Sequence, residues 1–202
     1  MKTFSIFGYI VDDATQTESL DDVKPYQIKT WLEGLDDNEE VEILFNSFGG
    51  SVSAGLAISN LIKQAKERGI KTTAHVLGVA CSSASFIALA CDKLVMDSNA
   101  FLMIHNPYTW IEGNAKELRK EADVLDKMKE SIIDVYSTKF RLSKEEISQW
   151  MNSETWIKGS DAPEVLNVEV IPTENEVIIM DSKKNKYFNK LHIPEEIKIM
   201  KD

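Results

Sequence analysis

The sequence has few residues of the kinds that bind metals or form disulfides. Its 202 residues include two cysteines and three histidines. No CxxC, HExxH or grouped His/Asp motif is present, so we expect no metal site. Cys81 and Cys91 lie in an Ala- and Ser-rich apolar segment, which favours free cytosolic thiols over a disulfide. A Gly-rich phosphate loop is also missing, so the chain is not expected to hydrolyse nucleotides or to need a cofactor.

Long apolar runs and excess positive charge are lacking too. The formal net charge is −10, which argues against nucleic acid or an anionic membrane as a partner, because phosphate groups are bound by clustered Lys and Arg. No apolar run approaches the ~20 residues of a membrane span. The first residues, Met1 to Thr3, are not followed by the long apolar region of a secretory signal. We therefore expect a cytoplasmic protein.

The amino-acid composition is that of a globular protein, and the order of its apolar segments is typical of an α/β domain. The apolar share is 43% and the charged share 28%, as in ordinary globular proteins. Short apolar runs alternate with segments of helical spacing, which predicts a largely parallel sheet. The expected strands are 4–11, 41–45, 71–77, 93–96 and 101–104, and the expected helices between them are 20–35, 54–69 and 82–90.

One long helix is predicted after these elements, over Asn114–Phe140, and a short helix capped by Ser143 follows it. This helix is longer than a domain of this size needs to cover its own sheet. A helix that projects toward a partner subunit and a simple core helix are both compatible with the pattern. After Val168 the chain becomes hydrophilic, with a candidate strand at Val177–Met180. We therefore expect a domain over 1–168 and a C-terminal extension, partly strand and partly mobile, over 169–202.

Three segments carry candidate chemistry. Ser82 follows a strand at the point where a helix should begin, which exposes its hydroxyl at a helix N-terminus. His105 ends another strand and is followed by Pro107. The pair Gly49–Gly50 ends a third strand, where backbone N–H groups can approach a ligand closely. A nucleophile, a base and backbone donors are the parts that acyl transfer needs, so a serine hydrolase is the leading interpretation.

Structural roles compete with this interpretation at each position. Ser82, Ser83 and Ser85 could all be small packing residues or helix caps, and any of them could be the nucleophile. Cys81 is a further candidate, although its alanine neighbours favour a buried, inert thiol. A lone histidine in a strand is more often structural, and a lone Gly–Gly is more often a tight turn. Their combination favours catalysis.

These segments resemble the proteolytic subunit of the Clp protease (ClpP), a serine peptidase family with a crotonase-like fold of repeated β-β-α units. Asn46–Val52 matches the family's glycine loop except at Phe48, where the family has Pro. Gly78–Ala84 matches its nucleophile segment, and Met103–Pro107 matches its Met-Ile-His-Gln-Pro segment. The resemblance covers roughly 4–168.

The resemblance implies roles for particular residues. Ser82 would be the nucleophile and His105 the base, and the backbone N–H groups of Gly50 and Ser83 would hold the oxyanion. The third catalytic position is occupied by Glu154, where the family has Asp. Glutamate serves as the orienting acid in some serine hydrolases, so Glu154 is the expected third member. A surface carboxylate is the alternative.

The resemblance also implies partners. The long helix corresponds to the handle region that stacks two heptameric rings, so a homo-oligomeric ring, heptamer or tetradecamer, is expected to enclose the active sites. The substrate would be an unfolded polypeptide. Family members carry an N-terminal segment that helps to bind an AAA+ unfoldase ATPase, and here the chain begins almost at the first strand, so that ATPase is not counted as an expected partner.

The short front and the altered third catalytic residue, Glu154, resemble the phage and prophage branch of the family, which is implicated in head maturation. A capsid or scaffold protein is then a candidate substrate. Two other functions remain open: a ring-forming structural subunit impaired in catalysis by Glu154, and an acyl-CoA enzyme of the crotonase superfamily. The last is disfavoured because those enzymes need neither Ser82 nor His105.

Overall fold

The computed structural model describes residues 1–17 and 19–173. The described strands are β1 (Lys2–Ile6), β2 (Glu40–Ser47), β3 (Lys71–Cys81), β4 (Lys93–Asp97), β5 (Phe101–Ile104), β6 (Thr155–Lys158) and β7 (Glu169–Ile171). The described helices are α1 (Pro25–Glu33), α2 (Val52–Ala65), α3 (Ser83–Ala90), α4 (Ala115–Tyr136) and α5 (Lys144–Asn152), with short 3₁₀ turns at Lys66–Arg68 and Ala162–Glu164.

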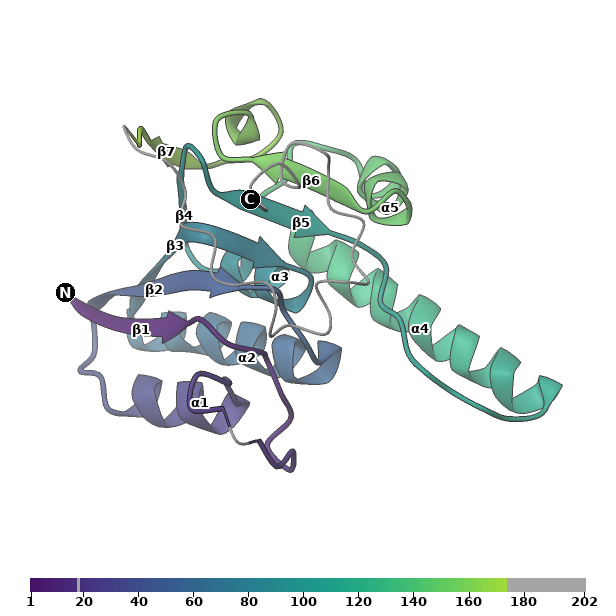
Figure 1. The fold of residues 1–202 in the computed structure, drawn as a ribbon. Coiled ribbons are helices and arrows are strands. Elements are labelled where there is room, and N and C mark those ends of the chain that lie inside the picture. Colours follow the sequence, from purple (N-terminus) through teal and green to yellow (C-terminus); the bar gives the residue numbers. More distant parts are fainter. Residues whose placement is uncertain (18, 174–202) are drawn as a thin grey trace, which may run out of the picture.

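The described strands form one sheet that divides at β3 (Figure 1). The main order is β1-β2-β3-β4-β7, and every pair in it is parallel. The first part of β3 pairs with β4, and its last residues pair with β5. Strand β6 then pairs antiparallel with β5. The α/β class and the mostly parallel sheet predicted from the sequence are confirmed.

The helices α1, α2 and α3 cover one face of this sheet. Alternate residues of β2 (Val41, Ile43, Phe45 and Ser47) are buried, as period-2 alternation requires when a strand presents one face to a core. The opposing α2 buries Ala54, Ile58 and Ile62 at helical spacing. This two-layer packing holds the strand ends that carry the candidate site.

Some element bounds differ from the sequence prediction. The first strand ends at Ile6 and not at Val11, although Ile10 forms an isolated parallel bridge with Gly50. The first helix begins at Pro25, where proline at the first helical position is favourable. Strands β6 and β7 were not predicted from the sequence. The candidate strand Val177–Met180 and most of the extension lie outside the described residues.

Helix α4 projects from the domain (Figure 1). Its buried residues, Ile132, Ile133, Val135 and Tyr136, all belong to its last two turns. Leu118, near its start, is 43% exposed in the single chain. Of the two interpretations of the long helix, projection is therefore the one that the structure shows.

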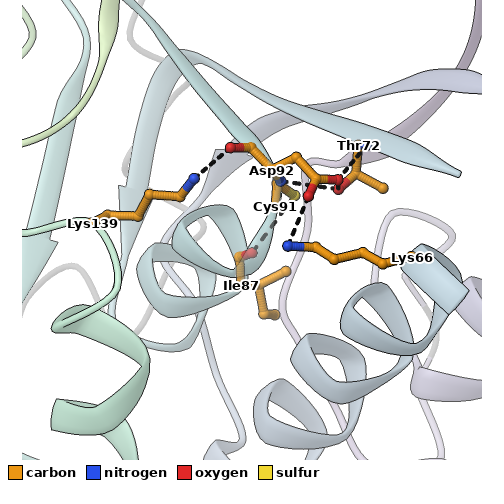
Figure 2. Close-up of polar contacts among 6 residues, drawn as sticks. All are labelled: Lys66, Thr72, Ile87, Cys91, Asp92 and Lys139. Atoms are coloured by element: carbon orange, nitrogen blue, oxygen red, sulfur yellow. Dashed lines mark hydrogen bonds and ion pairs between the residues drawn. The ribbon is translucent and has the colours of Figure 1, made fainter. Parts of the chain in front are cut away.

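A polar cluster around Asp92 anchors the end of α3 (Figure 2). Its carboxylate accepts hydrogen bonds from the Thr72 backbone and hydroxyl and forms an ion pair with Lys66 at 2.7 Å. Lys139, just beyond α4, donates to the Asp92 carbonyl oxygen. Burial acts to raise the pKa of Asp92, but the Lys66 and Thr72 contacts hold it below its usual value. The cluster thus fastens α3 and α4, the helices that flank the candidate site.

Candidate active site

The sheet register brings Ser82 and His105 together. In the parallel β3–β5 pair, Cys81 lies opposite Met103, so the two strands end at the same edge of the sheet. The next residue, Ser82, donates its backbone N–H to the Met103 carbonyl at 3.0 Å. The imidazole Nε2 of His105 lies 2.8 Å from Ser82 Oγ, a hydrogen-bonding distance. The two side chains singled out from the sequence are therefore in contact.

Ser82 lies on a strained turn between β3 and α3. Its φ of 54° and ψ of −125° are in a region that residues with a side chain rarely adopt. A serine on a sharp strand-to-helix turn presents its hydroxyl above the sheet, as in the nucleophile elbow of other hydrolases. In such a turn the hydroxyl stays accessible while the backbone around it is fixed.

Two residues that the sequence did not identify as partners support this turn. The Ser85 hydroxyl donates to the Ser82 carbonyl at 2.6 Å and lies 2.7 Å from the Tyr136 hydroxyl. Because Ser85 has one hydroxyl proton, Tyr136 must be the donor in the second bond. Tyr136 is fully buried at the end of α4. The sequence indicates only that Tyr136 lies on the apolar face of the long helix, and it does not predict the contact with Ser85.

The Gly49–Gly50 loop packs directly against the Ser82 turn. A Cβ atom at Gly49 would lie 2.5 Å from the Cys81 carbonyl oxygen and 2.9 Å from the Ser83 nitrogen. One at Gly50 would lie 2.1 Å from the Ile10 carbonyl oxygen. Both glycines also have positive φ, 92° and 153°. Only glycine fits this close approach of three backbone segments.

The two predicted oxyanion donors are backbone N–H groups of this loop and of α3. Ser83 is the first residue of α3, where N–H groups have no partner within the helix. On the loop, Ile10 bonds to the Gly49 carbonyl at 3.0 Å and to the Ser51 N–H at 2.7 Å. In a parallel bridge of this kind the N–H of the middle residue, Gly50, points away from Ile10. Both donors thus belong to segments that contact at Ser82.

Glu154 immediately precedes β6. Strands β5 and β6 pair Ile104 with Thr155, and His105 follows this pair on one strand while Glu154 precedes it on the other. Its φ is 48°, again positive for a residue with a side chain, and its Oε1 accepts the Trp156 Nε1–H at 3.5 Å. Backbone strain of this kind tends to occur at functional sites. Glu154 thus lies next to the strand pair that ends at His105.

Burial controls ionisation at the site. It lowers the pKa of His105 to about 4, because a buried imidazole loses solvation of its charged form. The imidazole is therefore neutral near pH 7 and able to accept a proton. Burial raises the pKa of the Cys81 thiol, with a further rise from the Glu154 charge, and raises that of Cys91 to about 12. Both thiols stay protonated, so Cys81 is a poor nucleophile.

A cavity of about 860 Å³ opens onto Ser82 and His105. One wall is formed by the Gly49–Gly50 loop with Phe48 and Val52, and another by Leu125 and Met128 of α4. This volume is in the range of sites that bury a small ligand or a few side chains. The reacting pair thus lies at the edge of a largely apolar cleft.

His75 does not reach this site. His75 lies between Glu42 at 3.3 Å and Asp97 at 3.1 Å on β2 and β4, which gives it a structural place in the sheet. His192 lies outside the described residues. Among residues 1–17 and 19–173, no group of three or more His, Cys, Asp or Glu side chains could hold a metal ion. No helix in the same part of the chain is long and apolar enough to span a membrane.

The fold and site define an α/β protein in which a serine on a strand-to-helix turn, beside a glycine loop, contacts a histidine at the end of a neighbouring strand. The family model described as Clp protease matches residues 16–171. The chain therefore belongs to the Clp protease family, as the sequence motifs predicted.

Known proteins resemble the chain in both sequence and structure. An ATP-dependent Clp protease proteolytic subunit from Borreliella afzelii is 31% identical over 134 residues, which are 65% of this chain and 66% of that protein. The corresponding subunit of Mesostigma viride is 28% identical over 174 residues, 83% and 75% of the two chains. A solved ClpP1 mutant from Listeria monocytogenes matches with a TM-score of 0.69 and 25% identity, over 86% of this chain and 92% of that one.

Proposed function

We propose that the chain is a serine endopeptidase that hydrolyses peptide bonds by means of Ser82, His105 and Glu154. The observation that carries this proposal is the 2.8 Å contact between Ser82 Oγ and His105 Nε2 on a strained turn. Membership of a family whose relatives are named proteolytic subunits supports it. The observed contact is the one that a base needs to activate a serine hydroxyl.

The mechanism follows from these positions. Nε2 of His105 takes the Ser82 proton as Oγ bonds to the substrate carbonyl carbon, and the Gly50 and Ser83 N–H groups stabilise the resulting oxyanion. His105 then gives the proton to the leaving amine, and an acyl-enzyme remains. A water molecule, deprotonated by His105, attacks the ester and restores Ser82. Because Nε2 is the acceptor, the resting ring proton is on Nδ1, where Glu154 would orient the imidazole.

The assembly is part of the same proposal. The first turns of α4 project away from the domain and carry the exposed Leu118, as a helix that meets other subunits would. A ring of identical subunits, heptamer or tetradecamer, would confine the active sites and admit unfolded chains. The role in phage head maturation, with a capsid or scaffold protein as substrate, stays a prediction.

Labelling with a fluorophosphonate tests the proposed chemistry. We expect the probe phosphorus to bond to Ser82 Oγ with loss of fluoride, and mass spectrometry of the digested protein to locate the adduct on the peptide that contains Ser82. The intact oligomer should cleave a short fluorogenic peptide at the same time. An oligomer that forms but takes up no label at Ser82 and cleaves no peptide would favour the structural-subunit alternative.

Cleavage activity should be lost on the acid side only at an unusually low pH. Because burial lowers the pKa of His105 to about 4, protonation removes the base only well below the usual histidine range. We expect kcat/KM for a neutral peptide to fall as the pH drops, with a midpoint near 4. A midpoint at 6.5 or above would show that burial does not lower the pKa of His105 in the working enzyme.

Stability must be measured alongside this profile. The unfolded chain protonates His105 near its ordinary pKa of about 6.5, so the folded state loses stability between that pH and 4, by at most about 1.4 kcal/mol per pH unit. Circular dichroism at each pH separates loss of the fold from titration of the base.

A further inference from the structure

The cleft beside Ser82 carries negative charge without compensating cations. Its lining includes three carboxylates, those of Asp12, Asp22 and Glu121. Among the described residues that line it, none is lysine or arginine. His105, which also lines the cleft, is neutral at pH 7 because burial lowers its pKa to about 4. The cleft thus has a formal charge of −3 at neutral pH.

The wall formed by α4 is apolar near the domain and acidic further out. Glu121, Leu125 and Met128 all line the cleft, and spacings of four and three residues place them on one face of the helix. Met128 is nearest to the buried end of α4, and Glu121 is nearest to its projecting end. Among the described residues, the Glu121 carboxylate forms no hydrogen bond or ion pair, which leaves its charge available to a ligand.

The opposite wall holds its carboxylates in fixed positions. Asp12 accepts a hydrogen bond from the Ser53 hydroxyl at 2.7 Å, and Asp22 accepts one from the Tyr9 backbone at 3.0 Å and another from the Thr17 hydroxyl. These donors are uncharged, so they orient both carboxylates without neutralising them. Carboxylates that are already oriented lose little entropy when a cation binds.

Lys24 does not neutralise the negative charge of the cleft, and two aromatic side chains favour cations there. The ammonium group of Lys24, on the same loop, donates to the carbonyl oxygens of Asp13 and Thr15 and is not part of the lining. Tyr108 and Trp110 add aromatic rings to the lining and are 51% and 78% exposed. Aromatic faces attract ammonium and guanidinium groups.

We propose that this cleft selects basic peptide segments, in which an apolar residue at the scissile bond is flanked by lysine or arginine. The apolar side chain would pack against Leu125, Met128 and Val52 beside Ser82, and the cationic side chains would lie toward Glu121, Asp12 and Asp22. This preference rests on the peptidase function proposed above and narrows its substrate class to chains with locally positive charge.

Internally quenched peptides test the preference directly. Three peptides of equal length share a central leucine, and its neighbours on both sides are lysine, alanine or glutamate. We expect kcat/KM to be about tenfold higher for the lysine peptide than for the glutamate peptide at low ionic strength, with alanine between them. The ratio should shrink toward one in 0.5 M NaCl, because salt screens charges across a solvent-filled cleft.

A matched pair of variants locates the effect. Glu121→Gln removes a cleft carboxylate, and Glu130→Gln removes an exposed carboxylate of the same helix that does not line the cleft. We expect Glu121→Gln to reduce the lysine-to-glutamate ratio about threefold and Glu130→Gln to leave it unchanged.

The outcomes separate this inference from the function on which it rests. If no peptide is cleaved and Ser82 takes up no fluorophosphonate, the peptidase proposal itself fails. If all three peptides are cleaved at equal rates, or if Glu121→Gln and Glu130→Gln change the ratio equally, the peptidase stands and the basic preference is overturned.

Discussion

Replacement of Ser82 by alanine is expected to lower kcat for peptide cleavage by about 10³-fold or more, because it removes the nucleophile and the covalent intermediate. KM for a small peptide should change little, because the cleft walls remain. The fold should also remain, since the Ser82 backbone N–H and carbonyl keep their bonds to Met103 and Ser85. Steady-state kinetics on the purified oligomer measures the effect.

Ser83→Ala is the matched control. The Ser83 hydroxyl is buried and, among the described residues, has no hydrogen-bond partner. Its removal should be neutral or slightly stabilising, since an unpaired buried hydroxyl is costly. The backbone N–H that is proposed to hold the oxyanion stays in place. If Ser83→Ala lost most of its kcat while Ser82→Ala kept its activity, the nucleophile would be Ser83 and the assignment to Ser82 would be wrong.

Replacement of Gly50 by alanine should damage both stability and catalysis. The new Cβ would lie 2.1 Å from the Ile10 carbonyl oxygen, at a φ of 153°. Relief of this overlap must move the backbone, and we expect the free energy of unfolding to fall by about 2–4 kcal/mol. The displaced Gly50 N–H should also lower kcat by about 10²-fold, the usual cost of one oxyanion donor. Chemical denaturation and peptide kinetics give the two values.

Gly34→Ala is the appropriate comparison for this variant. Gly34 has a φ of −81°, and a Cβ there would meet its nearest atoms at 3.5 Å, which is ordinary contact. The substitution should change stability by less than about 1 kcal/mol and leave kcat unaltered. Equal losses in Gly34→Ala and Gly50→Ala would show that the glycine loop has no particular role.

The central pair of the site could be predicted from the sequence because the relevant signals are local. Ser82 follows a strand directly and His105 ends one, and residues at the carboxyl ends of adjacent parallel strands meet at one edge of the sheet. Residue types alone left Ser82, Ser83 and Ser85 open as the nucleophile, and the resemblance to ClpP pointed to Ser82. These three nearby serines differ in orientation, and the turn at Ser82 directs its hydroxyl to His105 and leaves Ser85 to bond Tyr136.

The elements that the sequence did not reveal are short and depend on pairing. Strand β6 has four residues with no clear alternation, and its partner β5 lies some fifty positions earlier. Strand β7 has three residues. Segments of this length have no stable conformation of their own. Their contribution matters, because the β5–β6 ladder ends at the pair Ile104–Thr155, next to His105 and Glu154.

Sequence patterns were enough to predict the α/β class, the serine, histidine and glycine motifs and the resemblance to Clp proteases, because each depends on residue types at short spacings. The three-dimensional structure was needed to show that the Ser82 hydroxyl contacts the imidazole, how far α4 projects, and which carboxylates line the cleft. Those outcomes depend on contacts between residues far apart in the chain. Such contacts are set by packing and strand register, which local patterns do not specify.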